Sequence, residues 1–278
     1  MTTHPLKIVH HHAFKSAGST VMWILERNFP EQVLYIEGET PIQRIYCEDV
    51  SPYIDNKKYK AVSSHLLTIP EIGKNIADIH FSLLRDPVER TVSAYHFFIK
   101  RGDIDNTISL EEFCQTDFQS DNFQMKHSSI KDNDTPKGEW GMNRKIYEKI
   151  DSGEVFFGLV EYFDHTMLML DDFFAKNGTT FDGAYPQILN RSSHKKSQKW
   201  TIDDKVMDII LRRNESDIEL YNYAKKIFLH NFQECFEEKD LDSYRHRCAV
   251  LKRKFDRKWW KPRPVIVPDH TKWVRIGI

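Results

Sequence analysis

The stretch Leu6–His12, L-K-I-V-H-H-H, decides the fold because it runs into a polar loop that opens a helix. Its apolar residues predict a buried strand, and the loop Ala13–Thr20, A-F-K-S-A-G-S-T, follows directly. A junction of this kind directs backbone N–H groups and the positive end of the helix dipole toward one point. Lys15 adds a full positive charge there. The stretch therefore predicts an anion site.

The loop differs from the Walker A motif. That motif has the spacing G-x-x-x-x-G-K-[ST], whereas Lys15 precedes the only glycine of this loop, Gly18, and Ser19 and Thr20 follow that glycine. The spacing predicts a phosphate-like ligand and does not require a nucleoside triphosphate with magnesium. Taken alone, the loop would equally suit an ordinary polar connection between a strand and a helix.

A second strand-to-helix junction occupies Ile79–Tyr95, I-H-F-S-L-L-R-D-P-V-E-R-T-V-S-A-Y. After the apolar run, Asp86 fits the N-cap of a helix and Pro87 its first position. Arg85 stands at the end of the strand, and Ser93 lies two turns into the helix. A lone arginine would more often pair with a carboxylate. Two such junctions in one chain favour anion binding.

The rest of the chain alternates predicted strands and helices. Strands are expected near 6–12, 59–64, 79–84 and 155–160, and helices near 19–29, 87–100, 161–175, 203–213 and 216–236. This order predicts an α/β, three-layer, P-loop-like fold, in which helices flank a central parallel sheet and ligands bind at the carboxyl ends of the strands. The polar segment 102–141 is expected to lie outside the core, where it could bind an acceptor.

One domain is expected to hold most of the chain. With 278 residues, 40% of them hydrophobic, the chain can bury a large core, and no linker divides it. We expect this domain over 1–238, with 239–278 forming a C-terminal helix and an extended tail packed on it. Apolar stripes from Ile218 to Cys235 and from Leu241 to Trp259 predict packing faces. The basic residues beside the second stripe suit a solvated face, an anionic glycan or a membrane surface.

The charge of the chain is nearly balanced, with 40 basic and 41 acidic residues and a formal net charge of −1. No overall field for nucleic acid is therefore expected, and an anionic glycan would need a local patch. No apolar run reaches the length of a membrane span, and residues 1–5 lack a signal-peptide pattern. These features favour a cytoplasmic protein, or one from which an anchor was removed.

The two junctions together resemble the signatures of sulfotransferases that use 3′-phosphoadenosine 5′-phosphosulfate (PAPS), most closely the branch of the heparan sulfate 2-O- and 6-O-sulfotransferases. Residues 12–20 resemble the family's 5′-phosphosulfate loop, H-x-P-K-[TS]-[AG]-G-[TS]-[ST], and residues 84–95 its 3′-phosphate element. The loop departs from the pattern at Phe14, where the family usually has proline.

Three later segments are similar to the same family, so that the resemblance spans residues 6 to 236. Residues 121–126 resemble the D-N-x-Q-[TV]-R segment near the acceptor, with Lys126 in place of the usual arginine. Residues 157–164 resemble the G-L-x-E-x-F-D turn, and 217–224 a late helix. The basic loop 190–196, N-R-S-S-H-K-K, is expected either to close over the nucleotide or acceptor or to be an ordinary surface loop.

The resemblance implies a role for each site residue. The 3′-phosphate would be held by Arg85 and Ser93, and the 5′-phosphosulfate by the loop residues Lys15, Ser16, Ala17, Gly18, Ser19 and Thr20. Lys15 would also stabilise the bridging oxygen of the leaving phosphate. Family position points to His65 as the catalytic base; without that context, a capping or hydrogen-bonded structural histidine would be the preferred interpretation.

The expected activity is transfer of the sulfuryl group from PAPS to a hydroxyl of a glycan or other hydroxylated acceptor. No metal is expected to take part. Three consecutive histidines at 10–12 do not predict a metal site, because adjacent residues of a strand point to opposite faces. Two alternatives stay open: a P-loop kinase that uses ATP, and a nucleotide- or glycan-binding module without catalysis.

Overall fold

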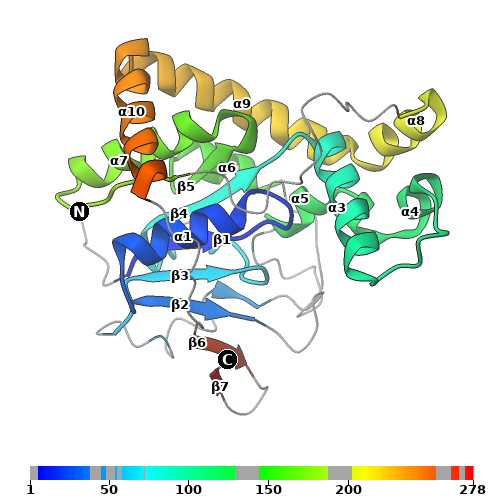
Figure 1. Cartoon of the computed structure of the whole chain (residues 1–278), viewed down its shortest axis with the longest axis horizontal. Coiled ribbons are helices and arrows are strands. Elements are labelled where there is room, and N and C mark those ends of the chain that lie inside the picture. The colour runs from blue at the N-terminus through cyan, green and yellow to red at the C-terminus, as the bar shows by residue number, and fades with distance from the viewer. Residues whose placement is uncertain are drawn as a thin grey trace.

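A central sheet organises the computed structural model, which describes residues 6–37, 45–47, 54, 58–71, 73–128, 130, 144–186 and 202–254, and the backbone of 264–268 and 273–277. Within these residues the strand order is β5-β4-β1-β3-β2-β6-β7 (Figure 1). Strands β1 to β6 run parallel, and β7 is antiparallel to β6. The strands are β1 Leu6–His11, β2 Val33–Ile36, β3 Ala61–Ser64, β4 Ala77–Leu84, β5 Val155–Leu159, β6 Pro264–Pro268 and β7 Trp273–Gly277.

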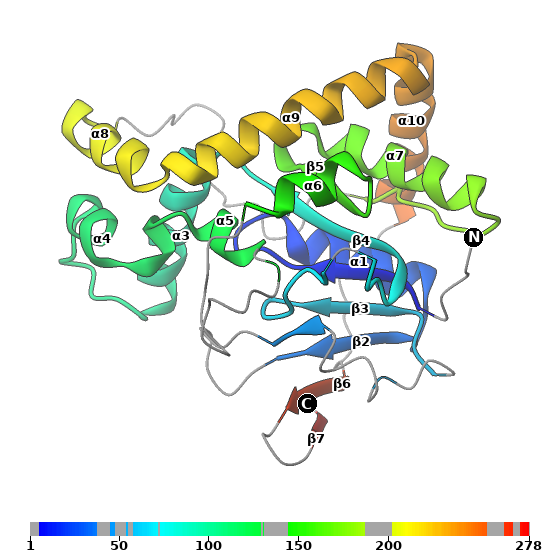
Figure 2. The same cartoon turned by 180° about the vertical axis from the view of Figure 1, so that it is seen from behind.

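Helices cover both faces of the sheet and its carboxyl edge. Helices α1, α7 and α10 pack in one cluster, and α5, α6 and α9 contribute to another on the opposite face (Figures 1 and 2). Helices α3, α4 and α8 pack together beyond the carboxyl ends of the strands. Their bounds are α1 Gly18–Asn28, α3 Pro87–Arg101, α4 Leu110–Thr116, α5 Phe123–His127, α6 Ile146–Asp151, α7 Phe163–Lys176, α8 Asp204–Arg213, α9 Glu215–Cys235 and α10 Glu238–Lys254.

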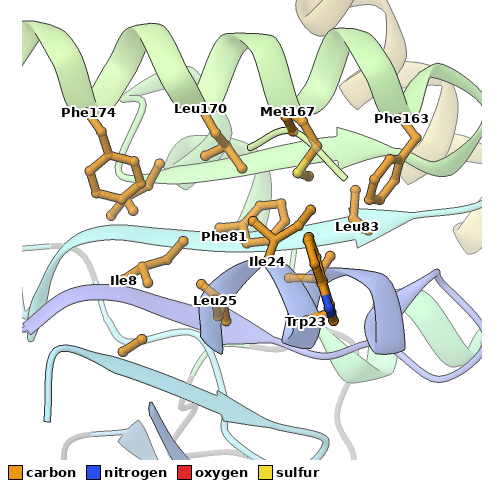
Figure 3. Packing of buried hydrophobic residues seen from close by; sticks show 14 of the residues in the cluster. Ile8, Trp23, Ile24, Leu25, Phe81, Leu83, Phe163, Met167, Leu170 and Phe174 are labelled. Carbon is orange, nitrogen blue, oxygen red and sulfur yellow. The ribbon is translucent and has the colours of Figure 1, made fainter. Parts of the chain in front are cut away.

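The largest core cluster fixes the strands that carry the two predicted anion sites. Ile24 of α1 and Met167 and Leu170 of α7 point toward Phe81 of β4 (Figure 3), and Leu25 of α1 belongs to the same cluster. All five side chains are buried. Burying a side chain of this size contributes about 1.5–3 kcal/mol. This packing holds α1 against β4, so that the loop before α1 lies near the end of β4.

The predicted α/β architecture, a parallel sheet flanked by helices, is confirmed. Several short elements were not predicted. They are the four-residue strand β2, the six-residue helix α6, and the strands β6 and β7, which the expected extended tail adds to the sheet edge. The stripe on α9 packs through Tyr221, Ala224 and Phe228, which are buried, but Cys235 at its end is exposed, contrary to the packing prediction.

The prediction that segment 102–141 lies outside the core was wrong for its described part. Helices α4 and α5 form there, and Phe113, Phe123 and Met125 are buried. Ser109 and Glu112 form a capping box that starts α4, which explains a helix in so polar a stretch. The described part of this segment therefore belongs to the packed core of the fold.

Candidate active site

The loop between β1 and α1 has an unusual backbone. Lys15 and Ala17 adopt positive φ angles of 66° and 58°, and Ala17 is the N-cap of α1 without a side-chain cap. Left-handed backbone at residues other than glycine costs of order 1–3 kcal/mol, and such residues cluster at functional sites. Because no side chain caps the helix, its positive dipole end is available to an anion.

Gly18 is required by the position of His12. A Cβ atom built on Gly18 would lie 1.5 Å from Nε2 of His12, so the imidazole occupies the space that any other residue would need. The contact brings the start of α1 close to the end of β1. It explains physically why the histidine and the glycine occur together in the loop pattern.

Two polar side chains of the loop fit an anionic ligand. Ser16 is almost fully buried, and its Oγ has no hydrogen-bond partner among the described residues. Nζ of Lys15 lies 4.3 Å from the ring centroid of Phe97. Burial, followed by the charges of Arg85 and Lys100, lowers the pKa of Lys15 to about 8. A bound anion would satisfy Ser16 and favour the charged form of Lys15.

The loop is anchored by Phe14, at the position where the similar family usually has proline. Its ring stacks on Phe98 with centroids 5.4 Å apart and meets Phe97 edge-on at 5.2 Å. Phe14 thus joins the cluster formed by α3, α4 and α8. Aromatic packing holds this loop where a proline ring would restrict φ.

Arg85 is held at the end of β4 by Gln124 of α5. The backbone N–H of Arg85 donates to Oε1 of Gln124 at 2.8 Å, and Nε2 of Gln124 donates to the carbonyl of Arg85 at 2.8 Å. Gln124 is fully buried. This two-way bond fixes the backbone of Arg85 and leaves its guanidinium to other partners.

Segment 121–126 is therefore a structural clamp for Arg85. Oδ1 of Asn122 accepts the N–H of Ser216 at 2.8 Å, and the buried carboxylate of Asp217 accepts the N–H groups of Gln124 and Met125 at 3.0 and 2.7 Å. Helices α5 and α9 thus cap each other. The sequence analysis expects this segment near the acceptor; its described contacts fix the Arg85 junction.

The guanidinium of Arg85 joins the two junctions. Its Nη1 donates to the carbonyl of Lys15 at 3.3 Å, and its Nη2 lies 3.5 Å from the carboxylate of Glu89. Ser93 is one helical turn beyond Glu89 on α3, so both residues share one side of that helix. The structure therefore brings Lys15 and Arg85 together, and Ser93 lies on the side of α3 that carries Glu89.

An exposed carboxylate to which the sequence analysis gave no role supports this junction. Oε1 of Glu161 accepts the N–H of Asp86 at 2.9 Å, and its Oε2 accepts the hydroxyl of Tyr221 at 3.0 Å. Glu161 is the acidic residue of the G-L-x-E-x-F-D pattern. The acidic residue of this motif thus joins the segment after β5 to the start of α3.

His65 lies directly beside the loop. Its Nδ1 is 2.7 Å from the carbonyl oxygen of His12, and the two imidazole rings stack with centroids 3.7 Å apart. A carbonyl can only accept, so Nδ1 carries the proton and Nε2 is the basic nitrogen. Burial lowers the pKa of His65 to about 4, and the bond to His12 opposes this only in part. The imidazole is neutral at neutral pH.

A model of the sulfotransferase family matches residues 1–224 of this chain. The chain belongs to the sulfotransferase family. No curated protein matches it. The match includes both junctions, the Gln124 clamp and His65, so sulfuryl transfer is the activity to which this geometry must be related.

The remaining loop residues of this sulfotransferase lie in the first turn of α1. The N–H of Thr20 donates to the carbonyl of Ala17 at 2.9 Å, and the side chain of Thr20 is fully buried. Gly18 and Ser19 stand at the very start of the helix. The basic loop 190–196 lies outside the described residues.

A pocket of about 730 Å³ in the sulfotransferase is lined by residues at the start of α3 and on α9. Its lining includes the carboxylates of Asp86, Glu89 and Glu161 and the ammonium of Lys225. Three acidic groups against one basic group disfavour a phosphate. The anion is therefore expected on the Lys15 side of Arg85.

Two features of the described residues concern a membrane and a metal ion. Among them, no helix is both long and apolar enough to cross a membrane. No three His, Cys, Asp or Glu side chains in that part of the chain gather in a way that could hold a metal ion.

Proposed function

We propose that this sulfotransferase transfers the sulfuryl group of PAPS to a hydroxyl of a glycan or a similar hydroxylated acceptor. The observation that carries the proposal is the contact of the Arg85 guanidinium with the Lys15 carbonyl, at 3.3 Å. It supports the proposal because it joins the arginine proposed for the 3′-phosphate to the loop proposed for the 5′-phosphosulfate. A ligand with phosphate groups at both positions would use both junctions at once.

The residues support an in-line transfer. The acceptor oxygen forms a bond to sulfur while the bond between sulfur and the bridging oxygen of the 5′-phosphate breaks. Nε2 of His65 accepts the hydroxyl proton, and the ammonium of Lys15 stabilises the negative charge on the departing phosphate. The unpartnered Oγ of Ser16 and the uncapped start of α1 would bind the same phosphate.

Binding selectivity tests the donor. Adenosine 3′,5′-bisphosphate, the product nucleotide, should bind more tightly than ATP, and labelled sulfate should pass from PAPS to members of a panel of glycans, lipids and phenols. Preference for ATP together with phosphate transfer would favour the kinase alternative. Binding of the bisphosphate without transfer to any acceptor would favour a non-catalytic module.

The substitution Arg85→Ala is expected to weaken binding of adenosine 3′,5′-bisphosphate by about 10- to 100-fold, because a charge-assisted hydrogen bond contributes roughly 1.5–3 kcal/mol. Adenosine 5′-phosphate lacks the 3′ group, so its affinity should hardly change. Calorimetry with both nucleotides measures the difference. As a matched control, Glu89→Gln removes the ion-pair partner of Arg85 and should leave the bisphosphate affinity intact or raise it. Equal losses for the two nucleotides would contradict the assignment of Arg85.

Activity is expected to survive removal of divalent metals. Lys15, Arg85 and the start of α1 already place positive charge around the loop, and that charge can stabilise the leaving phosphate. Turnover measured before and after treatment with EDTA checks this. Loss of turnover that one divalent metal restores would overturn the expectation and support a kinase-like mechanism.

A further inference from the structure

His11, the middle of the three consecutive histidines, lies on the face of the sheet opposite α1. Ile8 of β1 packs in the cluster that contains α1, whereas Val9 packs in a separate cluster. Side chains alternate along a strand, so His11 shares the face of Val9. It is fully buried there, as is His80 of the neighbouring strand β4. The mechanism proposed above uses neither of these two imidazoles.

A chain of hydrogen bonds joins the two imidazoles to the backbone at both ends. Nδ1 of His11 lies 3.1 Å from the carbonyl oxygen of Leu67, and Nε2 of His11 lies 3.0 Å from Nδ1 of His80. At the other end of the chain, the N–H of Ile76 donates to Nε2 of His80 at 3.2 Å. All four ring nitrogens therefore have a partner.

The two ends of this chain fix where the protons lie. A carbonyl only accepts, so Nδ1 of His11 carries a proton, and a backbone N–H only donates, so Nε2 of His80 carries none. With one proton on each ring, Nδ1 of His80 donates to Nε2 of His11, which is the direction that both ends require. A further proton on either ring would set two donors against each other. Both rings are therefore neutral, and His80 holds His11 in the tautomer that donates to Leu67.

The bond from His11 fixes the turn that carries His65. Ser64 starts this turn, and its Oγ accepts the N–H of Leu67 at 3.2 Å. The carbonyl of Leu67, two residues after His65, accepts the proton of His11. The next residue of β1, His12, accepts the Nδ1 proton of His65 through its carbonyl at 2.7 Å. The end of β1 thus binds both the ring of His65 and the backbone of its turn.

We propose that His11 is a positioning residue for the catalytic base His65, and that His80 selects the tautomer of His11. This inference rests on the proposed function. His11 contacts neither the donor nor the acceptor in this role; it holds the turn, so that Nε2 of His65 meets the acceptor hydroxyl. The rate is sensitive to such positioning, because a displacement of about 1 Å at a reacting group can cost about 10²-fold.

Two amide variants at position 11 separate the two contacts of the imidazole. In His11→Asn the amide nitrogen lies close to the place of Nδ1 and can still donate to Leu67, whereas in His11→Gln the amide reaches the place of Nε2 and contacts His80 instead. His11→Gln should lower kcat for sulfate transfer by about 10- to 100-fold while affinity for adenosine 3′,5′-bisphosphate stays near the wild-type value. His11→Asn should recover most of that loss. If His11 only tied β1 to β4, His11→Gln would be the more active variant.

The ring nitrogens of His65 give a second measurement, which does not depend on sulfate transfer. In protein whose histidines carry the heavy nitrogen isotope, NMR shows which ring nitrogen bears the proton, and His65→Ala identifies the signals of His65. The wild type and His11→Asn should show a protonated Nδ1 at His65. His11→Gln should show shifted or mixed signals, because its turn is no longer held.

His65 signals that are the same in both amide variants would overturn the proposal, and so would equal turnover of the two in a protein that transfers sulfate. Thermal melting reports whether each variant is folded. If His11→Gln is unfolded, His80→Leu replaces it, since it removes the donor that selects the tautomer of His11; a slower kcat with altered His65 signals supports the proposal, and wild-type behaviour contradicts it. Failure of the proposed function looks different, because the wild type would then transfer no sulfate from PAPS, while the NMR comparison would still test the role of His11.

Discussion

Replacing His65 with alanine is expected to lower kcat by on the order of 10²- to 10⁴-fold, the usual effect of removing a positioned proton acceptor. Affinity for adenosine 3′,5′-bisphosphate should stay near the wild-type value, because His65 contacts the loop through the ring and carbonyl of His12. Steady-state kinetics and calorimetry measure the two quantities. Lys15→Ala provides the contrast, since it should reduce both turnover and affinity for PAPS.

The burial of His65 determines the pH at which the rate of sulfate transfer falls on the acid side. An unperturbed histidine titrates near pH ~6.5, but burial lowers the pKa of His65 to about 4. Neutral imidazole is the active form, so its contribution is present above about pH 4 and is lost below it. Rates measured down to about pH 4 should show this limb in the wild type, and His65→Ala should lack it. Wild-type turnover in His65→Ala, or loss of activity by unfolding alone, would place the base elsewhere.

The two junctions could be predicted from the sequence because their signals are local. An apolar run ends in a loop or a cap within a few residues of the helix that follows, and the structure places Asp86 as the predicted N-cap, where its Oδ1 accepts the N–H of Glu89 at 3.0 Å. Gly18 and Lys15 stood out through their spacing. That the two junctions meet followed from the parallel order of the strands, and the contact of Arg85 with Lys15 agrees with it.

The supports of the site depend on contacts between distant parts of the chain. Gln124 and Asp217 are 93 residues apart, and no periodic pattern in the sequence indicates that the carboxylate of Asp217 accepts the N–H of Gln124. The sequence equally gives no sign that the side chain of Gln124 binds the backbone of Arg85. Strand β2 has only four residues, which is too short for its alternation to be recognised. Its place beside β3 depends on a register that the sequence pattern does not specify.

Gly18→Ala is expected to abolish measurable binding of adenosine 3′,5′-bisphosphate or to lower turnover at least about 10²-fold, since a displacement of about 1 Å at a reacting group can cost that much. The new Cβ would lie 1.5 Å from Nε2 of His12, so either the imidazole or the start of α1 must move. Moving the imidazole would also disturb its stack on His65. The double variant His12→Ala/Gly18→Ala removes the overlap and should recover nucleotide affinity, measured by calorimetry, while turnover stays low because His65 lacks its stacked neighbour. If the double variant binds no better than Gly18→Ala, the glycine serves the helix start itself, and the explanation through His12 is wrong.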